Sequence, residues 1–415
     1  MFGISEHRQQ RSQARSSAAR QRISAWLDSR DRGSPAGLVL TGPAAVAWAT
    51  GGIAPPVDRT AAVDLVWAVF TPDSSALVTT NVEAARIRAE YDPAAHGFTE
   101  LVEVPWYSPD GFALAAAELA AAPPSQLASD GHPAFGFDAG DELISLRLAL
   151  SGAELDDLAE LGHDAAHALQ SALNGWQPGE RDLDLQARCA ALIEAAGADA
   201  PVLIVGGDDR LASYRHPMAI GAPVRHLAMA VVVARRHGLH VALTRFASAG
   251  PVSRDYAALR TRVLAIEDAV LTASAPGASY GDALTALAAA YDSSSAIHGW
   301  NGHYQGGPIG FAQREFEIAP GQTESRWYAE PIAAGHAIAW NPSLPGGAKA
   351  EDTYVVTESD VRGVPGPRGL GGVPRLAECP PRTTPPRRLT DAPGWPVEQN
   401  DDRRPQRPAI LEVST

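Results

Sequence analysis

The 415-residue sequence contains only two cysteines, Cys189 and Cys379, which lie far apart and form no C-x-x-C pair. Disulfide frameworks and thiolate zinc sites need more cysteines at closer spacing, so neither is supported. Such sparing use of cysteine fits the reducing cytoplasm, which is the location that we predict. No run of 18 apolar residues occurs, and the N-terminus lacks the apolar core of a secretory signal. The sequence therefore predicts neither a membrane span nor export by that route.

Positive charge is also scarce. The chain has 34 Lys and Arg against 48 Asp and Glu, which gives a formal net charge of −14. Nucleic acids and anionic membranes bind basic surfaces that displace counterions, so we expect neither as a partner. No internal repeat and no phosphate-binding glycine motif is visible. The arginine-rich segment 1–30 predicts a frayed, solvated amphipathic helix rather than a binding arm. A small-molecule substrate is the expected partner.

The apolar fraction of 45% and the length predict a globular protein with two domains. Residues 1–152 predict an α/β domain. Short β-rich runs at 37–52 and 61–87 are broken by Gly, Pro and Asp, and a strand at 98–107 precedes an alanine-rich helix.

Residues 153–360 predict an α+β domain. Two amphipathic helices are joined at the turn "GWQPGE", and further helices are expected at 254–274 and 280–291. The apolar segments between them are spaced as hairpins rather than as β-α-β units, which favours an antiparallel sheet. Residues 361–388 are too rich in Pro, Gly and Arg to bury a core, and they predict a disordered insertion. In the tail, 389–415, "RPAILEV" is expected to add a last strand.

A series of short motifs in the second domain resembles, in order, the pita-bread family M24 of creatinase, aminopeptidase P and methionine aminopeptidase. After the helix pair before "GERDLD" come "YRHP" (214–217), "GLHVALTR" (238–245), "GGPIG" (306–310), "AGHAIAWNPS" (334–343) and "KAEDTYVVTE" (349–358). Each motif is short, and their common order makes the series specific. The resemblance implies an α+β pita-bread C-terminal domain preceded by a smaller α/β creatinase-type N-terminal domain. It also implies a homodimer.

The metal peptidases of this family hold two divalent ions with two aspartates, one histidine and two glutamates. On this sequence the aspartates fall on Val231 and Ala242, the histidine on Gly307 and the first glutamate on Asn341, while Glu351 keeps its residue type. Aliphatic side chains and glycine offer no lone pair, and an amide carries no charge to offset a cation. The resemblance therefore implies a divergent member that lacks most of the metal ligands and uses no cofactor.

Creatinase is the family's precedent for hydrolysing a C–N bond without a metal, using a histidine as acid and base. His216 matches the position of that histidine, and an imidazole that titrates near neutrality suits the task. Arg314 stands seven residues after Gly307, where the sequence resembles creatinase in having an arginine, and we expect it to hold a substrate carboxylate. Glu351 is the second expected catalytic residue.

Each assignment has a structural alternative. His216 is also explained as a buried, hydrogen-bonded histidine, and Arg314 as a surface arginine paired with a neighbouring glutamate. Glu351 is also explained as an ion-pair partner of Lys349 or Arg245.

Further substrate-binding residues are expected in the loop before the glycines and in the adjacent motifs: His303, Tyr304, Gln305, Asn341 and Arg245. The loop residues would align water or substrate, or else form a satisfied hydrogen-bond network. A single rebuilt zinc site is the other hypothesis, and it would use His216, His303, Glu351 and His240. These are suitable ligand types, but their spacing predicts no site.

In creatinase the small domain lends residues to the partner's active site. By that analogy alone, the candidates are Asp58, Arg59, Asn81 and Glu83, which are also explained as turn and capping residues.

Taken with the resemblance, the sequence predicts a metal-independent, creatinase-like hydrolase or lyase. It would act on a C–N bond of a small carboxylate-bearing substrate, with His216 as general acid and base. Two alternatives stay open: a non-catalytic pita-bread binding protein, and a metallo-aminopeptidase with a rebuilt metal site.

Overall fold

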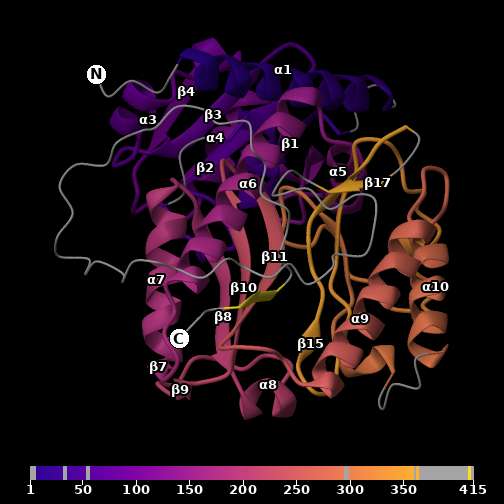
Figure 1. Ribbon diagram of the computed structural model, residues 1–415. Coiled ribbons are helices and arrows are strands. Elements are labelled where there is room, and N and C mark those ends of the chain that lie inside the picture. Colours follow the sequence, from indigo (N-terminus) through magenta and orange to yellow (C-terminus); the bar gives the residue numbers. More distant parts are fainter. Residues whose placement is uncertain are drawn as a thin grey trace.

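The computed structural model describes residues 6–30, 35–52, 57–293, 299–358, 361–363 and 410–412. Figure 1 shows an N-terminal layer of strands and helices across one end of a larger second unit. Within the described ranges, no helix is both long and apolar enough to span a membrane.

The N-terminal unit is built on one mixed sheet with strand order β4-β3-β2-β1-β5-β6. Its strands are β1 (Gly37–Leu40), β2 (Val66–Phe70), β3 (Ser75–Thr80), β4 (Glu100–Val104), β5 (Leu127–Ser129) and β6 (Phe137–Asp138). Strands β1, β2 and β3 pair antiparallel, whereas β4 and β5 join the sheet in parallel. Every residue of β1, β2 and β3 is buried, so both faces of the sheet are covered, as in an α/β domain.

The helices of this unit are α2 (Pro43–Thr50), α3 (Ala84–Glu90), α4 (Gly111–Leu119) and α5 (Gly140–Leu148). The sequence prediction treated 37–52 as a β-rich run, and α2 corrects it. All of α2 from Ala45 onward is buried, so no polar face reveals the helical period. Pro43 at its first turn and Gly51 at its C-cap, with φ 68°, are the signals that mark the helix.

Helix α1 (Glu6–Asp28) is not the frayed, solvated helix that its arginines predict. Arg15 and Ile23 are fully buried. The guanidinium of Arg15 donates from Nη1 to Asp157 Oδ2 at 2.7 Å and from Nη2 to the carbonyl of His237 at 2.7 Å. These partners come from the second unit, more than 140 positions along the chain, so α1 ties the two units together.

The second unit contains two antiparallel layers. In the first, the strand order β18-β11-β10-β8 joins β8 (Asp199–Gly207), β10 (Leu227–Arg236), β11 (Leu239–Ser248) and β18 (Ile410–Glu412), of which only β18 pairs in parallel. In the second, the order β12-β13-β16-β17 joins β12 (Gly306–Ile309), β13 (Ala337–Trp340), β16 (Tyr354–Val356) and β17 (Val361–Gly363). The β10–β11 hairpin turns at His237 and Gly238, whose φ angles of 51° and 81° suit a two-residue hairpin turn.

Four long helices flank these strands: α6 (Gly152–Asn174), α7 (Asp182–Ala195), α9 (Arg254–Ala273) and α10 (Tyr280–Ser293). Figure 1 shows α6 and α7 on one flank and α9 and α10 on the other. Helix α6 begins with a capping box formed by Ser151 and Glu154. The sequence places all four helices correctly because each carries an amphipathic period and polar first-turn residues.

The remaining described elements are short. They are α8 (Asp209–Ser213), β7 (Glu180–Arg181), β9 (Pro223–Val224), β14 (Ser343–Leu344) and β15 (Ala348–Lys349), with 3₁₀ turns η1 (Ala94–His96), η2 (Pro124–Gln126), η3 (Trp300–Gly302) and η4 (Arg326–Tyr328).

The insertion predicted at 361–388 begins with β17, which pairs with β16, and its residues 364–388 lie outside the described residues. Strand β18 falls within the predicted tail. Cys189 is a buried free thiol on α7, and Cys379 lies outside the described residues.

Candidate functional site

Glu351 is the centre of the candidate site. The residue is buried, and its backbone carbonyl accepts from the Thr244 N–H of β11 at 3.0 Å. Both carboxylate oxygens have protein donors: Asn341 Nδ2 donates to Oε1 at 3.2 Å, and Thr244 Oγ1 donates to Oε2 at 2.7 Å. Residues from β11, from the end of β13 and from the segment after β15 therefore hold one carboxylate in a fixed position.

Asn341 has one atom without a partner. Its Nδ2 is used by Glu351, but its buried Oδ1 has no hydrogen-bond partner among the described residues. A buried acceptor left without a donor costs about 1–3 kcal/mol. The atom is thus ready to accept an N–H or O–H from a molecule that enters the site.

Lys349 brings an ammonium group into the same place. Its Nζ lies 3.8 Å from Glu351 Oε2, and its side chain is only 3% exposed. Burial lowers the pKa of Lys349, and the Glu351 carboxylate opposes that shift. The sequence suggested Lys349 only as an alternative partner of Glu351, and this contact is present.

His303 lies between Lys349 and the open side of the site. Its Nδ1 bonds the backbone carbonyl of Tyr304, which can only accept, so Nδ1 carries the proton. Its Nε2 is then an acceptor, and Lys349 Nζ donates to it at 3.5 Å. Burial and the Lys349 ammonium lower the pKa of His303 to about 3, so the ring is neutral at pH 7.

His216 stands at the exposed mouth of the site. Its ring centroid is 5.0 Å from that of His303, with the planes at 65°. Partial burial and the Lys349 ammonium lower the pKa of His216, and Glu351 opposes them. The structure therefore places four side chains in a row from the surface to the buried carboxylate: His216, His303, Lys349 and Glu351.

Two arginines add positive charge around Lys349, because both lower the pKa of its ammonium. Arg314 has its Cδ 3.7 Å from the point where a side chain on Gly307 would begin. Arg314 also pairs with Glu317 at 3.3 Å, which is the pairing with a neighbouring glutamate that the alternative explanation predicted. Arg215, which the sequence analysis passed over, is half-buried and forms no ion pair with any described residue. The only signal for Arg215 is its place in "YRHP", beside His216.

The other expected site residues have structural contacts. Gln305 is buried and fully engaged, since its amide donates to the carbonyls of Trp300 and His303 at 2.6 and 2.8 Å and accepts from Tyr291. This is the satisfied network foreseen as the alternative. Tyr304 is 68% exposed at the rim of the site.

Arg245 lies behind the site rather than in it. The side chain is buried, and its guanidinium donates to Asp352 Oδ1 at 2.9 Å and to the carbonyl of Thr244 at 2.9 Å. Burial lowers the pKa of Arg245 to about 10. Its observed contacts support β11 and offer no evidence of substrate binding.

The single-zinc hypothesis is not supported by these positions. His240 lies four residues before Thr244 on β11 and bonds the carbonyl of Gly310 at 3.1 Å. In the part of the chain that the structure describes, no group of three or more His, Cys, Asp and Glu side chains is placed to hold a metal ion.

The N-terminal candidates make local or neighbouring contacts. Asp58 accepts from Thr60, Asn81 accepts from the Trp106 N–H, Glu83 pairs with Arg86, and Arg59 pairs with Glu194. Their predicted contribution to a partner's site stays a prediction.

A small cavity beside Lys349 has a volume of about 10 Å³ and is lined by Tyr214, Arg215, Ser343 and others. That is roughly the space of one water molecule. His216 and Tyr304 lie on the exposed side of the site.

Comparison with known proteins agrees with the motif series. Residues 156–358 match the model of a family described as metallopeptidase family M24. No curated protein matches the sequence significantly.

Several solved structures share the fold. The dipeptidase PepE from Mycobacterium ulcerans has a TM-score of 0.66 at 22% identity, covering 84% of this chain and 96% of that chain. An Xaa-Pro dipeptidase from Bacillus anthracis has a TM-score of 0.65 at 16% identity, with coverages of 84% and 97%. A prolidase from Pyrococcus furiosus has a TM-score of 0.61 at 15% identity, with coverages of 82% and 98%. The predicted two-part α/β and pita-bread fold is confirmed.

Proposed function

Because this chain belongs to metallopeptidase family M24, the pita-bread family that its motifs resemble, we propose that it hydrolyses a C–N bond in a small substrate that bears a carboxylate. The observation that carries the proposal is the positive charge of the site. Arg215 has no ion-pair partner among the described residues. Arg215 and Arg314 both lie close enough to Lys349 to lower the pKa of its ammonium. A guanidinium that is half-buried and unpaired suits a ligand carboxylate.

The family's two metal ions do not fit these residues. Val231 lies opposite Thr244 on β10, and Ala242 lies on β11, so two ligand positions carry aliphatic side chains. At the remaining carboxylate, both oxygens of Glu351 already accept protein hydrogen bonds, and an ammonium lies 3.8 Å away. A divalent cation would meet the charge of Lys349 and find one carboxylate to offset it. No step of the proposed reaction passes through a metal.

In the proposed reaction, His216 is the general base and then the general acid. Its lowered pKa keeps the ring neutral at pH 7, so it can take a proton from a water molecule. The water oxygen bonds to the carbon, the C–N bond breaks, and the proton passes from His216 to the leaving nitrogen. Arg215 holds the substrate carboxylate, and Arg314 adds to its binding. Asn341 Oδ1 accepts an N–H of the substrate, and Glu351 fixes the amide that presents this oxygen.

Release of amine from a panel of N-acyl amino acids, amidino acids and dipeptides, measured with a chelator present, tests this proposal. We expect turnover of at least one class. His216→Ala should abolish the turnover without changing the circular dichroism spectrum, whereas His226→Ala, at an exposed histidine, should leave it unchanged. Turnover that a chelator abolishes, or that survives in His216→Ala, would contradict the mechanism.

A non-catalytic pita-bread binding protein is the second candidate. It is favoured by the full engagement of the Glu351 oxygens in hydrogen bonds with Asn341 and Thr244. Binding of a panel member that depends on Arg215, without release of amine, would support this candidate. A homodimer in the cytoplasm remains a prediction under either function.

A further inference from the structure

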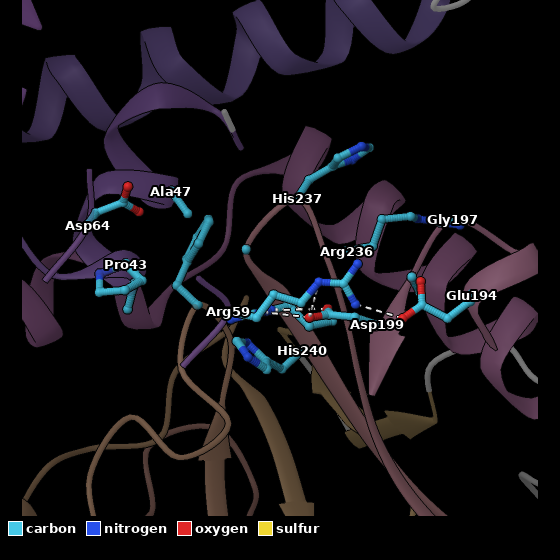
Figure 2. A pocket seen from close by; sticks show the side chains of 15 residues that line it. Pro43, Ala47, Arg59, Asp64, Glu194, Gly197, Asp199, Arg236, His237 and His240 are labelled. Atoms are coloured by element: carbon cyan, nitrogen blue, oxygen red, sulfur yellow. Dashed lines mark hydrogen bonds and ion pairs between the residues drawn. The ribbon is translucent and has the colours of Figure 1, made fainter. Parts of the chain in front are cut away.

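A second polar cavity lies between the two units, away from the candidate site (Figure 2). Its volume is about 290 Å³. Its walls come from α2, the segment after α7, the β10–β11 hairpin and the residues Arg59, Asp64 and Phe311. His240 of this cavity and Thr244 of the candidate site are four positions apart on β11, a separation of about 13 Å at 3.3 Å per residue. The two sites are therefore distinct places on the same strand.

Most charged groups of the cavity are paired. Arg235 donates to Asp199 through Nε at 3.1 Å and through Nη2 at 2.6 Å. Arg59 Nη1 contacts Glu194 Oε1 at 2.6 Å, as Figure 2 shows. Arg236 is directed elsewhere, since its Nη1 contacts Asp164 Oδ2 at 2.6 Å outside the cavity.

Asp64 is the exception. It is 7% exposed, and its Oδ1 accepts a hydrogen bond from the Val66 N–H at 3.1 Å. No basic side chain in the described part of the chain forms an ion pair with it. Burial raises the pKa of Asp64 even though the charges of Arg235 and Arg86 and nearby backbone N–H groups oppose the shift, so the carboxylate is left short of positive charge. A cation placed in the cavity would supply that charge.

His240 provides a second acceptor. Its Nδ1 bonds the Gly310 carbonyl at 3.1 Å and must therefore carry the proton, which leaves Nε2 with a free lone pair. Burial lowers the pKa of His240 to about 4, so the ring stays neutral and adds no positive charge. No hydrogen bond to its Nε2 is present among the residues that the structure describes.

Because Arg236 pairs with Asp164 outside the cavity, the guanidinium groups that count toward the charge of the cavity are those of Arg59 and Arg235. The cavity also holds three carboxylates, those of Asp64, Glu194 and Asp199. Its net charge is therefore one negative. The apolar part of the wall includes Pro43, Ala44, Ala47 and the ring of Phe311.

We propose that this cavity binds a small organic monocation: a primary amine with a short apolar body. The ammonium pairs with Asp64 and donates to His240 Nε2, and the apolar body packs between Phe311 and the alanines of α2. The cavity volume is at the lower limit of ordinary ligand pockets, about 300 Å³, so the ligand has the size of an arylalkylamine or a short alkylamine. Because both units contribute walls, the bound ligand also strengthens their packing. This inference is independent of the proposed hydrolase activity.

Calorimetric titration of the full-length protein with benzylammonium tests the proposal, with benzyl alcohol and benzoate as neutral and anionic probes of similar size. We expect benzylammonium to bind at least tenfold more tightly than either of the others. Asp64→Asn should weaken its binding at least tenfold, because the amide keeps an acceptor for the Val66 N–H but loses the charge. Asp73→Asn, at an exposed aspartate of the same unit, should leave the affinity unchanged.

Ala44→Leu is the second variant, which narrows the cavity without touching a charged group, and it should also weaken binding at least tenfold. If Asp64→Asn does not fold, the affinity of Ala44→Leu for benzylammonium tests the proposal instead. Equal affinity for the three probes, absence of binding, or undiminished binding by a folded Asp64→Asn or Ala44→Leu protein would overturn the proposal.

Discussion

Lys349 Nζ lies 3.8 Å from Glu351 Oε2, so an ammonium stands beside the carboxylate at the centre of the candidate site. Both side chains are almost fully buried. Neither charge can be hydrated, so each depends on the other and on the hydrogen bonds from Thr244 and Asn341.

Removing the ammonium alone should therefore destabilise the protein strongly. We expect Lys349→Met to lower the free energy of unfolding by about 3–5 kcal/mol, because it leaves the Glu351 carboxylate buried without its counter-charge. Urea denaturation followed by tryptophan fluorescence measures the loss. The double variant Lys349→Met/Glu351→Gln should recover much of it, since no charge then remains buried. Additive losses in the double variant would show that the two groups do not depend on each other.

Arg215 should act on substrate binding more than on the chemical step. For any substrate found with the panel described above, Arg215→Ala should raise KM at least tenfold, since a charge-assisted bond to the substrate carboxylate is lost. Arg215→Lys should restore part of the affinity, because it keeps the charge without the planar guanidinium. Steady-state kinetics separate KM from kcat, and Arg225→Ala at an exposed arginine is the control. An unchanged KM in Arg215→Ala would remove this residue from the binding site.

His240 should make stability depend on pH. Its pKa is lowered to about 4 in the folded protein, whereas a histidine in the unfolded chain titrates near 6.5. The unfolded state therefore binds more protons between these values, and stability falls as the pH falls from 6.5 toward 4. The full effect is on the order of 3 kcal/mol for a shift of this size.

Urea unfolding at pH 7.5 and pH 5 measures this dependence. His240→Gln should show a smaller loss between the two pH values than the unchanged protein, because glutamine does not titrate. His226→Gln, at an exposed histidine, should show the same loss as the unchanged protein. An equal loss in His240→Gln would mean that the ring is not held neutral by its burial.

The arginines of α1 should differ in their effects according to burial. Arg15 is fully buried against Asp157, so Arg15→Met should cost about 3 kcal/mol of unfolding free energy. Arg8 contacts Glu160 at 3.1 Å but is 48% exposed, so Arg8→Met should cost less than about 1 kcal/mol. Chemical denaturation of the two variants gives the comparison directly. Similar costs would mean that α1 is held by its apolar face alone.

The sequence predicted elements whose signals are local. Helix α9 begins at Arg254, where the predicted helix at 254–274 begins, and Ser253 is its N-cap. The sequence could not predict that Arg15 would be buried, because Asp157 and the His237 carbonyl come near Arg15 only in the folded chain.

The same limit applies to the site. The motif order placed Glu351 and His216 in one region, because the family resemblance supplies the fold. The ammonium beside Glu351 and the lack of an ion pair for Arg215 within the described ranges depend on burial and side-chain direction, which short motifs do not encode. Helix α2 was missed for a different reason, since a helix buried on all sides shows no amphipathic period.

The anchoring of α1 also constrains the order of events during synthesis. Helix α1 leaves the ribosome before α6 and the β10–β11 hairpin, because Asp157 and His237 follow Arg15 by more than 140 residues. The Arg15 guanidinium gains Asp157 only when α6 has emerged, and it gains the His237 carbonyl only when the β10–β11 hairpin has followed. Helix α1 thus completes its docking only after the intervening sheet and α6 have been synthesised.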